Sequence, residues 1–404
     1  MILGIEKGQA IGKITVPTSK SMAHRLIIAA AMCQGQESII RGIDPCEDIL
    51  ATIDCLRALG VKIEYKRRTA KVVGIDFSNA TPSGVLNCRE SGSTLRFLIP
   101  IAWLSGKEVC FTGSERLLSR SQSVYEQMAK EYGLTFKKEE GRITVKGPIN
   151  AGEYFIDGNI SSQFITGLLF ALSTLSGDSR IIINTEIESE PYVNMTVAAM
   201  KEFKVKVYRE GYYSFFMFGG QEYRAGEKRV EGDWSNAAFL EALGFIGGEV
   251  KVRGLKKRSL QGDMVFLKHF SALNDGFAEI DITSCPDLGP ILFTIAAIKY
   301  GAKFVGTRRL RDKESDRISA MASELSKFGA ELTVEENSVT VKKCELHAPK
   351  ERLCAHNDHR IVMSLTVLCT LFGGEIEGCE AVKKSYPDFF EDIKKLGIQL
   401  YEIN

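Results

Sequence analysis

A six-fold internal repeat constrains the fold of this chain more than any other feature of the sequence. In each copy a small polar cluster is followed at once by an apolar run with helical spacing. The six copies are Pro17–Ala31, Glu90–Ala102, Gly158–Ala171, Glu231–Ala242, Asp281–Ala296 and His356–Val367. They recur on the order of every 60–75 residues, and self-similarity at a fixed period is typical of a repeat architecture.

A second pattern alternates with the first. It is an amphipathic helix that runs into a short alternating strand, in most copies through a glycine where a helix C-cap is expected. The clear copies are Leu56–Ile63, Met128–Phe136, Met200–Val207, Leu325–Leu332 and Ile393–Leu400, and a degraded copy lies around Leu267–Phe270. Each repeat is therefore predicted to contain strands and two helices.

The two helices of a repeat differ in polarity. The first is apolar almost all round, as in Leu26–Met32, and a helix of this kind is buried on all sides. The second is polar on one face, which we expect to meet solvent. Six such units exceed what one core usually holds, so we expect an α/β fold of two domains with three repeats each. The chain is predicted to cross between them near Pro17–Ser19 and in the polar stretch Gln221–Arg229.

The composition narrows the class of protein. The 404 residues carry 52 Lys and Arg against 51 Asp and Glu, and 44% of them are hydrophobic. This balance argues against disorder, and a net charge of +1 lacks the basic surplus of a nucleic-acid binder. No apolar run reaches the ~18 residues of a membrane span, and the N-terminus lacks the features of a signal peptide. Ten scattered cysteines without a CxxC pair favour reduced thiols in a cytoplasmic protein.

The polar clusters stand at the predicted starts of the buried helices. A helix N-terminus offers free N–H groups and a partial positive charge, so Ser and Thr there either cap the helix or help to bind an anion. Arg25, Arg96 and Arg360 are each followed by an apolar run, where an unpaired charge would be costly. Arg side chains match both phosphate and carboxylate groups. The residues therefore predict a two-lobed enzyme or binding protein for small polyanionic molecules.

Two carboxylates in such clusters, Asp287 and Glu314, are candidates for acid–base catalysis. Other chemistries have less support. The chain contains neither GxxxxGK(S/T) nor GxGxxG, and no cysteine lies in a glycine-rich loop beside a basic group. His356 and His359 stand three residues apart with no further ligand cluster nearby, so no metal site is expected.

Eight short motifs, in order along the whole chain, carry a resemblance to a known family. They are Ser19–Arg25, Ser161–Gln163, Ser189–Tyr192, Val230–Asp233, Ser259–Asp263, Lys313–Arg317, Asn357–Arg360 and Lys384–Asp388. Through them the chain resembles the enolpyruvyl transferases, and within that family those that act on shikimate 3-phosphate. One such match would be weak, whereas eight in the family's order are specific.

The resemblance implies a fold. This is a pseudo-symmetric α/β fold of six βαβαββ repeats, an inverse α/β prism in two lobes. One lobe would comprise residues 1–18 and 230–404 and the other residues 19–229, with the active site in the cleft between them.

The resemblance also implies a reaction. The enolpyruvyl group of phosphoenolpyruvate would be transferred to the 5-hydroxyl of shikimate 3-phosphate, by addition and elimination through a tetrahedral intermediate. Phosphate would be released, in the shikimate pathway of aromatic amino acid biosynthesis. No cofactor and no metal are implied.

The same resemblance assigns roles to individual residues. Those expected at shikimate 3-phosphate are Lys20, Ser21, Arg25, Ser161, Ser162, Gln163, Ser189, Tyr192, Asp287 and Lys313. Those expected at phosphoenolpyruvate are Lys20, Gly92, Arg116, Gln163, Arg317, Arg360 and Lys384. The expected catalytic residues are the acid–base pair Asp287 and Glu314, together with Lys20 and His359.

Two departures from the family pattern and two alternatives stay open. Glu90 and Phe97 flank the segment that carries Gly92, where the family more often has Asn and Pro, and Arg309 stands where many members have Asn. The nearest alternative is a UDP-N-acetylglucosamine enolpyruvyl transferase, but the loop Thr112–Arg120 lacks the reactive cysteine typical of that family. A non-catalytic repeat scaffold or RNA-end-binding protein would need a basic surplus. We expect a cytoplasmic monomer with small-molecule substrates and no nucleic-acid or membrane partner.

Overall fold

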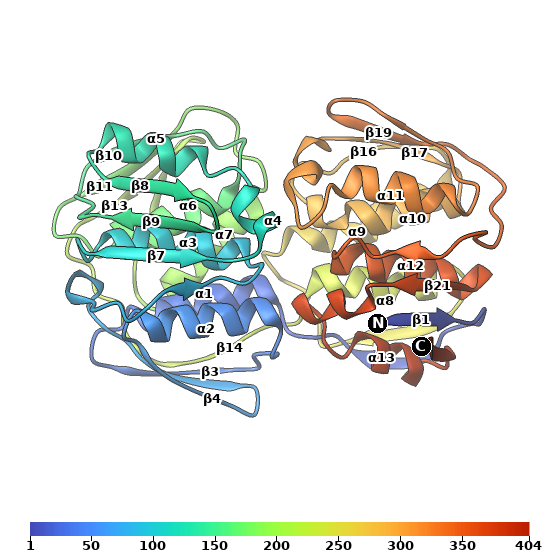
Figure 1. Ribbon diagram of the computed structural model, residues 1–404, viewed down its shortest axis with the longest axis horizontal. Helices are drawn as coiled ribbons and strands as arrows, with labels where there is room; N and C mark the ends of the chain where they lie inside the picture. The colour runs from blue at the N-terminus through green and yellow to red at the C-terminus, as the bar shows by residue number, and fades with distance from the viewer. Residues whose placement is uncertain (404) are drawn as a thin grey trace. The chain divides into compact units, whose positions relative to one another are not determined.

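Five of the six sequence repeats of the described chain fold as a strand, a buried helix, a second strand parallel to the first, an amphipathic helix and an antiparallel pair of strands (Figure 1). The repeat that begins before Gly92 shows the whole pattern. Its elements are β6 (Leu86–Asn87), α3 (Gly92–Trp103), β7 (Glu108–Thr112), α5 (Ser123–Glu131), β8 (Thr135–Glu139) and β9 (Arg142–Lys146), with the short α4 (Glu115–Ser119) after β7. In its sheet, β6 and β7 are parallel, and β9 is antiparallel to both β7 and β8. The computed structural model describes residues 1–403.

The chain divides into two compact units, each with its own hydrophobic core. Unit 1 is Met1–Pro17 with Gly232–Asn404, and unit 2 is Thr18–Glu231. The polar stretch before the second crossing is partly ordered as a strand, because Glu227–Arg229 forms β14 and pairs in parallel with β3 (Glu37–Arg41) of unit 2.

Unit 2 contains two further complete repeats. The first comprises β14, α1 (Lys20–Ala31), β3, α2 (Glu47–Ala58), β4 (Lys62–Lys66) and β5 (Thr69–Val73), with the short η1 (Phe77–Asn79) after it. The other comprises β10 (Glu153–Ile156), α6 (Ser162–Leu172), β11 (Ser179–Ile183), α7 (Glu190–Glu202), β12 (Tyr208–Glu210) and β13 (Ser214–Met217).

Unit 1 contains two complete repeats. The first comprises β16 (Ala278–Asp281), η3 (Pro286–Leu288), α10 (Gly289–Ile298), β17 (Ala302–Val305), η4 (Arg308–Asp312), α11 (Arg317–Ser326), β18 (Leu332–Val334) and β19 (Ser338–Val341). The second comprises β20 (Leu353–Cys354), α12 (His359–Phe372), β21 (Gly374–Glu377), η5 (Cys379–Lys384), α13 (Phe389–Lys395) and β22 (Leu400–Ile403). The N-terminal strand β1 (Ile2–Ile5) completes this sheet between β21 and β22.

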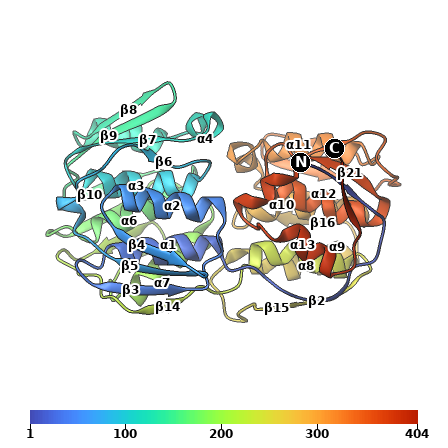
Figure 2. The same cartoon turned by 60° about the horizontal axis from the view of Figure 1, so that its bottom comes forward.

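The remaining repeat of unit 1 is incomplete within residues 1–403. It comprises β2 (Ile11–Thr15), α8 (Trp234–Phe245), β15 (Glu249–Arg253), η2 (Gly262–Val265) and α9 (Phe266–Asp275). Its sheet holds only the parallel pair β2 and β15, which Figure 2 shows at the border of the unit. After α9 the chain passes directly to β16, so the hairpin is missing. Six complete βαβαββ repeats were expected; the described chain has five, and the degraded copy at Leu267–Phe270 belongs to the sixth.

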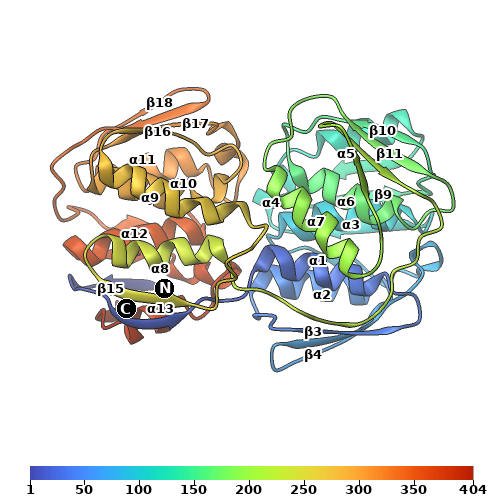
Figure 3. The same ribbon diagram turned by 180° about the vertical axis from the view of Figure 1, so that it is seen from behind.

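Within each unit the first helices of the repeats lie inside and the sheets outside (Figures 1 and 3). These first helices are buried almost all round, as their sequences predict. In α6 every residue except Gln163 is buried, whereas α8 has a partly exposed side at Glu241, Gly244 and Phe245. The α/β repeat fold is thus confirmed. Among residues 1–403, no helix combines the length and the apolar character needed to cross a membrane, and all ten cysteines are free of disulfide bonds.

Candidate active site

The polar clusters cap the buried helices. Within the described residues, five of the six buried first helices start with a side chain that accepts a hydrogen bond from a backbone N–H of the first turn. These helices are α1, α3, α6, α8 and α12. The caps are Ser19, Ser91, Ser161, Asp233 and Asp358. Each cap satisfies an otherwise orphaned donor and fixes the position from which the following charged residues extend.

In unit 1, three cations converge on the carboxylate of Asp287. One oxygen accepts hydrogen bonds from Arg317 Nη1 at 2.8 Å and Lys313 Nζ at 3.2 Å. The other accepts from Arg360 Nη2 at 3.2 Å. Asp287 lies on η3, Lys313 and Arg317 lie around the start of α11, and Arg360 lies in the first turn of α12. The structure thus brings together four of the residues expected at the substrates.

The charges around Asp287 control its protonation. Burial alone would raise the pKa of Asp287, but the charges of Arg360, Lys313 and Arg317 outweigh that effect and hold the pKa well below its usual range. Arg317 is itself fixed, because its Nε and Nη2 bond both oxygens of the buried Asp358 at 2.8 and 3.2 Å. Asp358 therefore positions one of the three cations, and the sequence reasoning assigned it no role.

The second candidate for acid–base catalysis, Glu314, lies beside this cluster. Glu314 Oε2 is 2.9 Å from His359 Nδ1 and 3.7 Å from the ammonium of Lys384. Lys384 also donates to the backbone oxygen of Asn357. His359 is buried, and its contact with Glu314 holds the carboxylate in one orientation. Glu314, His359 and Lys384, which were expected in one site, thus lie in direct contact.

Among the described residues, one group of side chains has the spacing of metal ligands, and it belongs to the same cluster. Ligand atoms of Glu314, Asp358 and His359 all lie within 4.8 Å of one another. However, Asp358 is bonded by Arg317, and Glu314 has Lys384 and His359 beside it. These cationic and hydrogen-bonding partners already occupy the carboxylates, so the donor set fits an ion-pair network better than a metal site.

In unit 2, Arg25 is a buried cation whose hydrogen-bond partners are neutral. Its Nε donates to Thr196 Oγ1 at 2.8 Å, and its Nη atoms donate to the backbone oxygens of Ser21 and Tyr192 at 2.6 and 2.9 Å. Its guanidinium also lies 5.2 Å from the ring centre of Phe97. Burial without a carboxylate lowers the pKa of Arg25 to about 10. Such a group gains from an added anion.

A second buried arginine of unit 2 orients a predicted ligand residue. Arg96 donates to Gln163 Oε1 at 2.9 Å and to the backbone oxygen of Ser121 at 2.8 Å, and its guanidinium lies 4.8 Å from the ring centre of Phe164. The amide nitrogen of Gln163 donates to Ser93 Oγ at 3.1 Å. Both ends of the Gln163 amide are therefore held.

The structure favours a neighbour of Arg116 as the partner of Gly92. A Cβ atom placed on Gly92 would lie 2.5 Å from Nη1 of Arg120, so only glycine permits this approach of the guanidinium. Arg120 is buried, whereas Arg116 is exposed. The sequence reasoning took the loop Thr112–Arg120 into account but selected the other arginine, because spacing along the loop does not show which one turns inward.

The remaining predicted residues of unit 2 lie at helix starts. Lys20 opens α1 and forms an ion pair with Asp48 at 2.8 Å, a partner that the sequence reasoning missed because it comes from α2. Ser161 and Ser162 are buried at the start of α6. Ser189, also buried, precedes α7 with a left-handed backbone, φ 57°. Tyr192 stands in the first turn of α7, at Arg25.

Known proteins match this chain over nearly its whole length. The model of one family, EPSP synthase (3-phosphoshikimate 1-carboxyvinyltransferase), matches residues 5–274 and 272–393. The 3-phosphoshikimate 1-carboxyvinyltransferase of Clostridium novyi is 40% identical over 418 residues, which cover 96% of this chain and 95% of that protein. That of Clostridium kluyveri is 38% identical, with 97% of this chain and 96% of the relative covered.

Solved structures share the fold. EPSP synthase from Acinetobacter baumannii aligns with a TM-score of 0.79 at 23% identity, over 99% of this chain and all of that one. An enolpyruvyl transferase from Streptomyces tendae aligns with a TM-score of 0.76 at 14% identity, over 99% of this chain and 98% of that one. By the match of the family model and of these relatives over nearly its whole length, the chain belongs to the EPSP synthase (3-phosphoshikimate 1-carboxyvinyltransferase) family.

Proposed function

We propose that this chain transfers the enolpyruvyl group of phosphoenolpyruvate to the 5-hydroxyl of shikimate 3-phosphate and releases phosphate. The observation that carries the proposal is the group around Asp287, where Lys313, Arg317 and Arg360 surround one carboxylate beside Glu314. Together with Lys384, four cations face the carboxylates of Asp287, Glu314 and Asp358. Such a group suits a reaction between two anionic substrates that also needs proton transfer.

In the addition step, the 5-oxygen of shikimate 3-phosphate loses its proton and bonds to C2 of phosphoenolpyruvate, and C3 gains a proton. In the elimination step, C3 loses a proton, the bond between C2 and the phosphate oxygen breaks, and phosphate leaves. Asp287 and Glu314 serve as the acid–base pair, and His359 orients Glu314. Positioned acid–base groups of this kind contribute about 10²–10⁴-fold each.

The binding roles follow the chemistry of the side chains. Lys20, Ser21, Arg25, Ser161, Ser162, Gln163, Ser189, Tyr192, Asp287 and Lys313 hold shikimate 3-phosphate in this proposal. Lys20, Gly92, Arg116, Gln163, Arg317, Arg360 and Lys384 hold phosphoenolpyruvate, and we add Arg120 to them because of its approach to Gly92. The reaction uses no cofactor, and the enzyme acts as a cytoplasmic monomer without nucleic-acid or membrane partners.

Substrate binding is expected to adjust the acid–base pair. Bound phosphate and carboxylate groups share Lys313, Arg317 and Arg360 with Asp287, so each cation acts less strongly on that carboxylate. The pKa of Asp287 then rises from its depressed value towards the range in which a carboxylate can accept and return a proton.

A phosphate-release assay with shikimate 3-phosphate and phosphoenolpyruvate tests the function. Turnover is expected with this pair and not with UDP-N-acetylglucosamine as acceptor. The Asp287→Asn variant should lose turnover, whereas Glu279→Gln, at an exposed ion pair with Lys303, should keep it. Turnover with UDP-N-acetylglucosamine alone would assign the chain to a different transferase, and turnover with neither acceptor would refute the proposal.

A further inference from the structure

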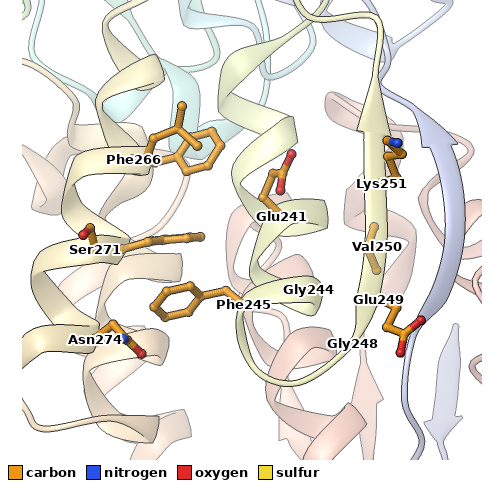
Figure 4. Close-up of a pocket in the computed structure, with 12 residues that line it drawn as sticks. Glu241, Gly244, Phe245, Gly248, Glu249, Val250, Lys251, Phe266, Ser271 and Asn274 are labelled. Carbon is orange, nitrogen blue, oxygen red and sulfur yellow. The ribbon is translucent and has the colours of Figure 1, made fainter.

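The incomplete repeat of unit 1 leaves open a space that is covered in other repeats. In three complete repeats the first hairpin strand packs on the amphipathic helix: β4 on α2, β8 on α5 and β18 on α11. The repeat of β15 has no such hairpin within residues 1–403. A cavity of about 680 Å³ lies there between α8, β15 and α9 (Figure 4). Its volume falls within the range of small-molecule sites.

The cavity has an aromatic side. Phe245 and Phe270 have ring centres 5.1 Å apart, and Phe270 and Phe266 have ring centres 5.2 Å apart. Leu267 is 52% exposed beside them, although it is a large apolar side chain. A flat apolar group finds partners on this side.

The polar groups stand at the two ends of the cavity. Figure 4 shows Glu241 on α8 and Lys251 on β15 towards one end, and Asn274 on α9 towards the other. Among residues 1–403, Glu241 has no hydrogen bond or ion pair, and its partial burial raises its pKa. Lys251 also has no partner in this part of the chain. A half-buried carboxylate of this kind favours a cationic ligand.

Charged groups near the other end are already engaged or exposed. Lys299 donates to Asn274 Oδ1 at 3.2 Å, and its ammonium lies 4.9 Å from the ring centre of Phe245. Glu249 and Lys251 are both exposed residues of β15, but Figure 4 shows Lys251 towards the Glu241 end of the cavity and Glu249 towards the Asn274 end. The pair of opposite charges at the Glu241 end is therefore Glu241 and Lys251.

We propose that this cavity binds an aromatic amino acid. The ammonium group bonds Glu241, the carboxylate bonds Lys251, and the ring packs on Phe245 and Phe270. In an amino acid the two charged groups are attached to one carbon and the ring lies on one side of it, which matches Glu241 and Lys251 towards one end of the cavity and the ring of Phe245 towards the other. The site is separate from the residues assigned to the transfer reaction, and the proposal does not depend on that assignment.

Calorimetric titration of the full chain with L-phenylalanine tests the proposal. Two analogues divide the ligand: 2-phenylethylamine lacks the carboxylate and 3-phenylpropionate lacks the ammonium. We expect saturable binding of L-phenylalanine, and weaker binding of both analogues and of L-leucine. Glu241→Gln should weaken L-phenylalanine and 2-phenylethylamine at least about 10-fold and leave 3-phenylpropionate unchanged. Lys251→Gln should weaken L-phenylalanine and 3-phenylpropionate and leave 2-phenylethylamine unchanged.

Glu249→Gln is the matched control, because it removes an exposed carboxylate of the same strand. It should leave the affinity for L-phenylalanine unchanged, and equal thermal midpoints for all variants would show that each one folds. Absence of saturable binding at about 10 mM L-phenylalanine would overturn the proposal. So would binding that Glu241→Gln and Glu249→Gln weaken equally, since this would indicate unspecific attraction to surface carboxylates.

Discussion

Arg25 and Asp287 are both largely buried charges, and their surroundings differ in kind. Asp287 has three cations within hydrogen-bond distance, whereas Arg25 has neutral oxygens and aromatic rings. A buried charge without an opposite charge carries a desolvation cost that an incoming ion can offset. In the proposed function, Arg25 therefore binds an anion directly, and Asp287 holds its cations in place until the anionic substrates share them.

Removing the Asp287 charge should separate catalysis from binding. We expect Asp287→Asn to lower kcat about 10²–10⁴-fold, because the amide can neither accept nor return the proton. The KM for phosphoenolpyruvate should stay within a few-fold of the original value or fall, because Arg317 and Arg360 lose a competing carboxylate. Steady-state phosphate release measures both constants. A variant with near-original kcat would remove Asp287 from the acid–base pair.

Arg116 and Arg120, which are four positions apart in the sequence, offer a direct comparison. Arg120 approaches Gly92 and is buried, whereas Arg116 is exposed. We expect Arg120→Gln to raise the KM for phosphoenolpyruvate roughly 10–100-fold, the size of a lost charged hydrogen bond, and Arg116→Gln to change it little. Initial rates at varied phosphoenolpyruvate give both values. The reverse order would support the assignment made from the sequence.

His24 gives the stability of the chain a pH dependence. Burial, with a smaller effect of Lys20 and Arg25, lowers the pKa of His24 well below its usual value, so the folded chain keeps this ring neutral. The unfolded chain takes up the proton as the pH falls below about 6.5, so this residue costs stability in acid. Between pH 8 and 5 the loss is about 2 kcal/mol for one fully shifted histidine.

Urea unfolding of the original chain and of His24→Asn at pH 8 and pH 5 measures this contribution. The amide of asparagine lies where His24 Nδ1 lies and can keep the hydrogen bond with Thr52 Oγ1 at 2.8 Å, so the comparison isolates the titration. The original chain should lose about 2 kcal/mol more than the variant between the two pH values. Equal losses would mean that His24 becomes protonated in the folded state.

At the scale of elements, local periodicity predicts the helices and misses the pairings between distant segments. The apolar runs of α6 and α10 and the caps before them follow from sequence, because each depends on residues within a few positions. The strand β14 does not, since Glu227–Arg229 has no apolar alternation and is ordered by pairing with β3. The missing hairpin after α9 is likewise an absence that only comparison with the other sheets reveals.

The sequence likewise predicted some residues of the candidate site and missed others. Motif order along the chain pointed to Asp287, Glu314 and their cations, which the structure places in contact. It gave no role to Asp48, which lies outside the motifs, or to Asp358, which lies within the motif Asn357–Arg360. These two residues bond Lys20 and Arg317 from other helices. Partners separated by 28 or 41 residues in sequence have no local spacing to identify them.

The start of α3 allows a prediction about an element rather than a charge. In Gly92→Ala the added Cβ meets Nη1 of Arg120 at 2.5 Å, and the flexible end of that side chain must move. We expect a higher KM for phosphoenolpyruvate because Arg120 is displaced. The free energy of unfolding should stay unchanged or rise by up to about 1 kcal/mol, because alanine has a higher helix propensity than glycine. Rates and thermal unfolding of the same sample measure both. A loss of stability would show that the backbone, rather than Arg120, yields.

At the scale of the molecule, the continuity of unit 2 sets it apart. Its three sheets contain only strands from Thr18–Glu231, because β14, its last strand, completes the sheet of β3, and its core consists of residues of the same range. Unit 1 takes β1 and β2 from the N-terminal segment and all its other elements from beyond Gly232. Only unit 2 can therefore be produced as one uninterrupted chain.

We expect the fragment 18–231 to fold alone and to bind shikimate 3-phosphate. Eight of the ten residues proposed for this substrate lie in it, among them Arg25 and Gln163, and its core is independent of unit 1. The ligand at about 100 times its dissociation constant should stabilise the fragment by about 2.7 kcal/mol in urea unfolding. Phosphoenolpyruvate should stabilise it less, because Arg317, Arg360 and Lys384 are absent.

Arg25→Gln is the control, since it should reduce the response to shikimate 3-phosphate without preventing folding. A folded fragment that ignores shikimate 3-phosphate would shift the recognition of this substrate to Asp287 and Lys313 of unit 1, whereas an unfolded fragment would show that the core of unit 2 is insufficient by itself.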